Sequence, residues 1–104
     1  MVEFDLESDF RFKASLESLG VDGELDVLIA IDEILEKRLG WDDFVRLHGW
    51  DRVPLFGQET YPGAIELFIF AIVGESGQYY QVVATTVNNT VVICAVARRI
   101  TPLP

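Results

Sequence analysis

Three apolar stretches near the C-terminus decide the fold: residues 64–73 (AIELFIFAIV), 79–87 (YYQVVATTV) and 91–97 (VVICAVA). Short polar segments separate them, Gly-Glu-Ser-Gly at 74–77 and Asn-Asn at 88–89. Apolar runs of this length, bounded by turn residues, predict three consecutive antiparallel strands. A sheet with one wet face alternates apolar and polar side chains, so these nearly continuous runs indicate that both faces are covered.

The turn lengths predict which side chains share a face of this sheet. A two-residue Asn-Asn turn pairs Val83 with Cys94, and a four-residue loop at 74–77 pairs Ile69 with Val82. One face is then almost wholly apolar and should receive a helix. The other face is apolar at its centre with polar groups around it, and we predict that it binds a partner. Its residues are Glu66, Phe68, Phe70, Tyr79, Gln81, Val83, Thr85 and Arg98.

The segment before the strands predicts helices. Residues 22–39 favour a central, mostly buried helix, because acidic residues open it, Lys37 and Arg38 close it, and apolar residues cover most of its circumference. A short third helix is expected from Asp42 or Asp43 to His48, ended by a glycine.

The N-terminal residues are more ambiguous. Residues 9–19 predict a first helix capped by Ser8 or Asp9, although an alternating strand pattern also fits part of this segment. Residues 2–6 alternate as an edge strand does, and an extended arm fits equally well.

Together these elements predict an α+β fold: two to three N-terminal helices packed on one face of a C-terminal antiparallel meander of three to four strands. The 104 residues suffice for a single domain, 1–104, with a core that needs no disulfides. Pro54 reduces residues 52–56 to an edge strand or a loop.

A second candidate surface lies in residues 41–61, which mix aromatic rings with opposite charges. Trp, Tyr and Arg dominate the energetics of binding surfaces. We predict that the binding residues here are His48, Trp50, Asp51 and Arg52. The structural alternative is that Trp41 and Phe56 complete the core while Arg52 pairs with Asp51.

The acidity of the chain is confined to its first half. The net charge is −9; residues 1–43 hold thirteen Asp or Glu against four Lys or Arg, and residues 44–104 hold four of each. This balance argues against direct binding of nucleic acid, which requires clustered cations. It predicts either a solvated helical surface or an acidic face that attracts a basic protein.

No pattern of residues predicts catalysis, a metal site or a cofactor. His48 and Cys94 are the single residues of their kinds, and metal, phosphate-loop and serine-hydrolase motifs are absent. Cys94 lies in the most apolar strand, where a thiol is usually a small core residue. The lone cysteine, the acidic N-terminus and the lack of a membrane-length apolar run favour the cytoplasm.

The sequence therefore predicts a non-enzymatic interaction or regulatory module that forms a homodimer through the second face of its sheet. That face could instead bind a small molecule, or be covered by the N-terminal strand and residues 50–63. An alternative function is a small acidic inhibitor, or immunity-type protein, directed against a basic partner.

Overall fold

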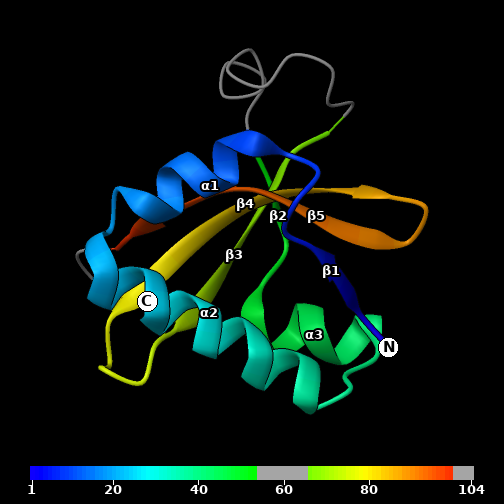
Figure 1. Cartoon of the computed structure of the whole chain (residues 1–104). Helices are drawn as coiled ribbons and strands as arrows, with labels where there is room; N and C mark the ends of the chain where they lie inside the picture. Colours follow the sequence, from blue (N-terminus) through cyan, green and yellow to red (C-terminus); the bar gives the residue numbers. More distant parts are fainter. Residues whose placement is uncertain (54–65, 100–104) are drawn as a thin grey trace.

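The computed structural model of the chain describes residues 1–53 and 66–99. The elements in chain order are β1 (Glu3–Asp5), α1 (Phe10–Glu17), α2 (Gly20–Glu36), α3 (Trp41–His48), β2 (Asp51–Arg52), β3 (Phe68–Val73), β4 (Tyr79–Val87) and β5 (Thr90–Arg98) (Figure 1). The predicted α+β class is confirmed. Residues 54–56 of the predicted edge segment, as well as residues 64 and 65, lie outside the described residues.

The sheet has five strands in the order β1-β5-β4-β3-β2. Strands β3, β4 and β5 form the predicted antiparallel meander, and β2 adds to β3 in antiparallel orientation. The N-terminal strand β1 runs parallel to β5, so the sheet is mixed and not the antiparallel meander of three to four strands that we predicted. Parallel pairing needs a long connection, and here all three helices and the meander lie between the paired strands.

The helix ends follow local chemistry. Asp9 caps α1, since its carboxylate accepts a 3.0 Å hydrogen bond from the Arg11 backbone N–H. Gly49 ends α3 as predicted, with a φ of 83° that a glycine adopts without strain. α2 begins at Gly20, two residues before the predicted start at Asp22, which instead lies in the first turn. The sequence misplaces this boundary because α2 starts almost directly after α1.

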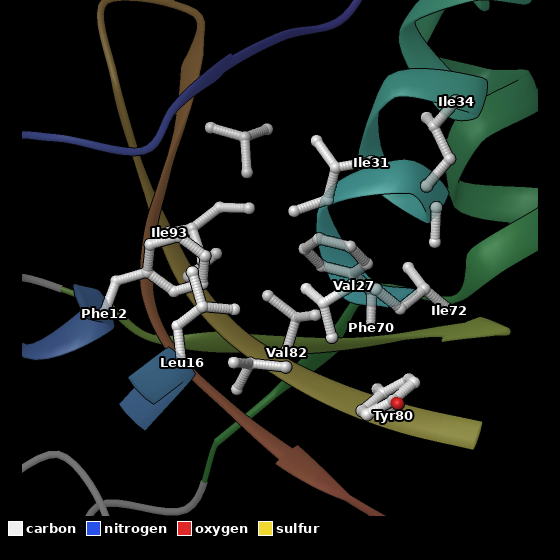
Figure 2. Close-up of a cluster of buried hydrophobic side chains, with 14 of the residues drawn as sticks. Phe12, Leu16, Val27, Ile31, Ile34, Phe70, Ile72, Tyr80, Val82 and Ile93 are labelled. Atoms are coloured by element: carbon white, nitrogen blue, oxygen red, sulfur yellow. The ribbon is translucent and has the colours of Figure 1, made fainter. Parts of the chain in front are cut away.

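All three helices pack on the same face of the sheet. Phe12 and Leu16 of α1, four residues of α2 and Phe44 of α3 join one buried cluster with alternate residues of β3, β4 and β5. Figure 2 shows side chains from α1, α2 and these strands meeting in this core. The strand residues in it are Phe70, Ile72, Tyr80, Val82, Ala84, Val91, Ile93 and Val96.

The β3–β4 register differs from the prediction by one residue. Five residues, 74–78, separate the two strands, because Val73 pairs with Tyr79 and not with Gln78. Ile69 therefore pairs with Val83 and not with Val82. A one-residue slip turns every side chain of the strand to the other face. Phe68 and Phe70, predicted on the second face, accordingly lie on the helix face.

A bulge changes the second half of β5. The Asn88-Asn89 turn is confirmed, with φ of 51° and 66°. However, Val83 pairs with Ala95, so Cys94 is an extra residue in the strand and the predicted Val83–Cys94 pair is wrong. Beyond the bulge the faces are exchanged, and Arg98 lies on the helix face, opposite Tyr80.

Candidate functional surfaces

The predicted binding face of the sheet is only partly assembled. Tyr79, Gln81, Val83 and Thr85 do share the face away from the helices, since they alternate with the core residues of β4. All four are half-buried. Phe68, Phe70 and Arg98 lie on the opposite face, for the reasons of register and bulge given above.

Glu66 and Arg52 form an ion pair of 2.7 Å, and both side chains are well exposed. The Glu66 carbonyl also accepts a 2.6 Å hydrogen bond from the Thr85 hydroxyl, which ties the start of β3 to β4. Arg52 thus pairs with Glu66. The alternative interpretation of the sequence, in which Arg52 pairs with Asp51, is wrong.

The aromatic residues of the 41–52 segment pack largely against other rings of the protein. The Trp50 ring stacks on Phe68, with centroids 4.8 Å apart, and lies edge-on to Trp41 at 4.9 Å. Trp50 is half-buried and Trp41 is 43% exposed. Tyr61 and Phe56 lie outside the described residues. The rings therefore extend the core toward β2, and among the described aromatic rings of this segment only Trp41 presents substantial surface to solvent.

His48 fastens the end of α3 to β3. Its Nδ1 lies 3.1 Å from the Ala71 carbonyl, which can only accept, so Nδ1 carries the proton and donates. Nε2 is then a bare acceptor, and it has no hydrogen-bond partner among the described residues. Burial lowers the pKa of His48, the Ala71 bond opposes that shift, and the charge of Lys37 adds to it. The imidazole is therefore neutral at neutral pH.

Asp26 is a buried carboxylate that sequence analysis missed. It lies on α2 at 9% exposure and accepts hydrogen bonds from the Tyr80 hydroxyl at 2.8 Å and the Ser76 hydroxyl at 2.7 Å. Burial alone would raise the pKa of Asp26, but bonds from Ser76, Tyr80 and the loop backbone outweigh it, and the pKa falls below its usual value. The only signal in the sequence is its position between apolar residues at helical spacing.

A hollow of about 350 Å³ lies beside Asp26 and is also lined by Glu75 and Arg98. The Arg98 guanidinium donates to the Leu19 carbonyl at 2.6 Å, so it holds the junction of α1 and α2. Burial and the adjacent Asp26 raise the pKa of Tyr80. The phenol of Tyr80 is protonated, and the hydrogen bonds to Asp26 occupy its carboxylate oxygens. Neither group is therefore available as a nucleophile or a base, and the cluster serves to hold the β3–β4 loop to α2.

Cys94 is buried, as predicted for a core thiol, and burial together with nearby Asp9 raises its pKa to about 12. Its thiolate is therefore negligible at neutral pH. Among residues 1–53 and 66–99, no group of three His, Cys, Asp or Glu side chains is placed to hold a metal ion. None of the helices within those ranges combines the length and the apolar character required to cross a bilayer.

The exposed carboxylates gather on the helices. We use the name acidic helical layer for the seven exposed carboxylates of α1, α2 and α3: Glu17, Asp22, Asp32, Glu33, Glu36, Asp42 and Asp43. Two apolar residues, Val21 at 84% exposure and Leu25 at 57%, lie on α2 beside them. The prediction that α2 is buried around most of its circumference is therefore wrong, and its outer side is open and mixed in character.

Comparisons with known proteins add no assignment: no family model, no curated protein and no solved structure matches this chain.

Proposed function

We propose that this protein is a non-enzymatic interaction module whose acidic helical layer docks a basic macromolecular partner. The observation that carries the proposal is spatial. The acidic half of the sequence, residues 1–43, forms α1, α2 and the first three residues of α3, and all three helices lie on one face of the sheet. Charge segregation along the chain thus becomes charge segregation across the molecule, which accelerates encounter with an oppositely charged surface.

The outward side of α2 supplies more than charge. Val21 and Leu25 are one helical turn apart, and Asp32 and Glu36 repeat the same spacing further along. All four side chains are exposed. Exposed apolar groups among carboxylates suit a partner that presents apolar and cationic side chains together, because burial of the apolar groups adds affinity to electrostatic attraction. Inhibition of a basic enzyme or of a nucleic-acid-binding protein is one form that such docking could take.

The test uses a helical peptide built from Leu and Lys as the probe, with its binding followed by fluorescence anisotropy. We expect Asp32→Asn combined with Glu36→Gln to weaken binding by roughly two- to thirtyfold at low salt, since exposed ion pairs contribute about 0.2–1 kcal/mol each. The difference should shrink as added salt screens the charges.

The matched control combines Glu3→Gln with Glu75→Gln, which makes the same change in net charge at exposed positions outside the helices. Equal weakening by the two double variants would show that only the overall charge matters, and would overturn docking at the acidic helical layer.

A second candidate function is self-association through the sheet face away from the helices. No described helix covers this face, and its rim exposes Val73 at 47% and Val87 at 53%. An apolar centre with a polar rim suits a homodimer interface.

For this candidate, Val83→Lys should convert a dimer to a monomer without loss of secondary structure, as measured by native mass spectrometry and circular dichroism. The control is Thr86→Lys, an exposed position on the same strand but on its other face. A protein that is monomeric before substitution, or a Val83→Lys variant that remains dimeric, would exclude this interface.

A further inference from the structure

A groove of about 450 Å³ lies between α1, α2 and the segment that links β1 to α1. Apolar side chains form most of its lining: Leu6 of the link, Phe10, Phe12 and Leu16 of α1, and Leu28 of α2. Phe12 and Leu16 belong to the buried cluster, and Leu6 and Leu28 are partly buried against it. The groove therefore exposes the outer edge of the core between the two helices.

One aromatic ring at the rim of this groove is not part of the core. Phe10, the first residue of α1, is 80% exposed and is the most exposed aromatic side chain among the described residues. Aromatic residues are enriched in protein interfaces, and an exposed ring beside an apolar groove is typical of a docking surface. The Phe10 ring is placed where it can pack on an occupant of the groove.

The charges that line the groove cancel. They are Glu7, Asp9 and Lys13. Asp9 forms an ion pair of 2.6 Å with Arg11, and Glu7 and Lys13 carry opposite charges. The lining together with Arg11 thus has no net charge, so it suits an apolar group better than an ion of either sign.

The surroundings of the groove, in contrast, are acidic. Leu25, Leu28 and Asp32 are three and four residues apart on α2, so they lie along one side of the helix. The groove meets this row at Leu28, between the exposed side chains of Leu25 and Asp32. On α1 the exposed Glu17 comes directly after Leu16. A neutral apolar groove therefore lies within the acidic helical layer, whose carboxylates favour an occupant with cationic groups beside its apolar ones.

We propose that this groove seats the apolar side chains of an amphipathic, basic helix of the partner, with Phe10 packed against them. None of the lining residues belongs to a strand, so side-chain contacts and not main-chain pairing must hold the occupant. A helix meets this need with apolar residues at i, i+3, i+4 and i+7. This inference rests on the proposed docking at the acidic helical layer and locates its apolar contact.

A second copy of this chain fits the groove less well than a basic helix. The helices of a second copy would bring the same carboxylates, among them Glu17 and Asp32, toward those of the first. Like charges brought together at an interface are strongly disfavoured.

The probes are two helical peptides of identical Leu and Lys composition. In one, the Leu residues recur at i, i+3, i+4 and i+7 and form a single face; in the other they are spread around the helix. Both peptides carry the same charge, so the acidic helical layer attracts them equally. We expect the amphipathic peptide to bind at least about tenfold more tightly in fluorescence anisotropy, because only its Leu side chains can enter the groove together.

Equal affinities of the two peptides would overturn the groove as a docking site. Docking by charge alone would survive that result, provided that Asp32→Asn combined with Glu36→Gln still weakens the binding of both peptides. Failure of both peptides to bind would overturn docking at the acidic helical layer, and this inference with it.

A variant at the rim tests whether the preference arises in this groove. Phe10→Ala should reduce the roughly tenfold preference to below about threefold and leave the binding of the second peptide unchanged. Because Phe10 is exposed, the fold should tolerate the change, which circular dichroism verifies. Val87→Ala, which shortens an exposed apolar side chain at the end of β4, is the control and should leave both affinities unchanged. A preference that persists in Phe10→Ala, or that falls equally in Val87→Ala, would overturn the proposal.

Discussion

Replacement of Gly74 by alanine should destabilise this protein by about 2–4 kcal/mol, although the change adds a single methyl group. A Cβ built at Gly74 would lie 2.1–2.3 Å from three atoms of the Asp26 carboxyl group. Real Cβ atoms do not approach other atoms so closely, so either the loop or Asp26 must move. Either movement separates Asp26 from Ser76 and Tyr80 and leaves buried polar groups without partners.

The measurement is thermal and urea unfolding of the Gly74→Ala variant. A loss of this size should lower the midpoint of thermal unfolding by roughly 10–20 °C in a domain of this length. Gly40→Ala is the matched control, because a Cβ there meets no atom within 4 Å. Its cost should stay below about 1 kcal/mol, the effect of a poorer N-cap residue on α3.

A double variant identifies the cause of the loss. If the new methyl group clashes with the Asp26 carboxylate, then Gly74→Ala should reduce the free energy of unfolding only slightly in a protein that already carries Asp26→Ala. The losses of the two single variants will then not add up in the double variant. Full additivity would place the strain in the backbone of the loop instead, and the account of a close approach to Asp26 would be wrong.

The sequence predicts the elements of this fold better than their pairing. Helices appear where caps and apolar spacing agree, as in α1 behind Asp9 and α3 before Gly49. The parallel strand β1 was predicted as either an edge strand or an extended arm, and its partner β5 is eighty-five residues or more away in the chain. No local pattern can specify such a pairing, because it depends on how the helices pack.

Two single-residue irregularities decide which residues share a face. Gln78 joins the β3–β4 loop, and Cys94 is extruded from the pairing of β4 with β5. Neither residue is a glycine or a proline, so the sequence gives no signal of a bulge or of a longer loop at these positions. Because side chains alternate between the two faces, the longer loop places Phe70 on the face opposite to the predicted one, and the bulge does the same to Arg98. The predicted face was correct for Tyr79, Gln81, Val83 and Thr85.

The Asp26 cluster was not predicted from the sequence. Asp26 is one of many acidic residues in the first half of the chain, and only its contact with a loop fifty residues later distinguishes it. Sequence patterns predict what a segment forms, but the polar contacts between segments depend on register.

The buried carboxylate of Asp26 should make the stability of this protein depend on pH in the acid range. Asp26→Asn should cost about 2–4 kcal/mol at pH 7, because the amide offers one acceptor oxygen where the carboxylate offers two, and Ser76 and Tyr80 need both. Asp22→Asn, an exposed position one turn earlier on α2, should change the free energy of unfolding by less than about 0.5 kcal/mol.

The dependence on pH follows from the direction of the Asp26 pKa. Because the folded pKa lies below that of the unfolded chain, the ionised carboxylate stabilises the protein fully above the unfolded value of about 3.9 and less as pH falls through the folded value. The stability difference between the wild-type protein and Asp26→Asn should thus be constant from about pH 5 to 8 and shrink below about pH 4. Urea unfolding over this pH range measures the difference.

If desolvation outweighed the hydrogen bonds, the folded pKa of Asp26 would be raised, and the stability of the wild-type protein relative to Asp26→Asn would increase as the pH fell. Growth of the difference in acid would therefore show that Ser76 and Tyr80 do not hold Asp26 in its ionised form.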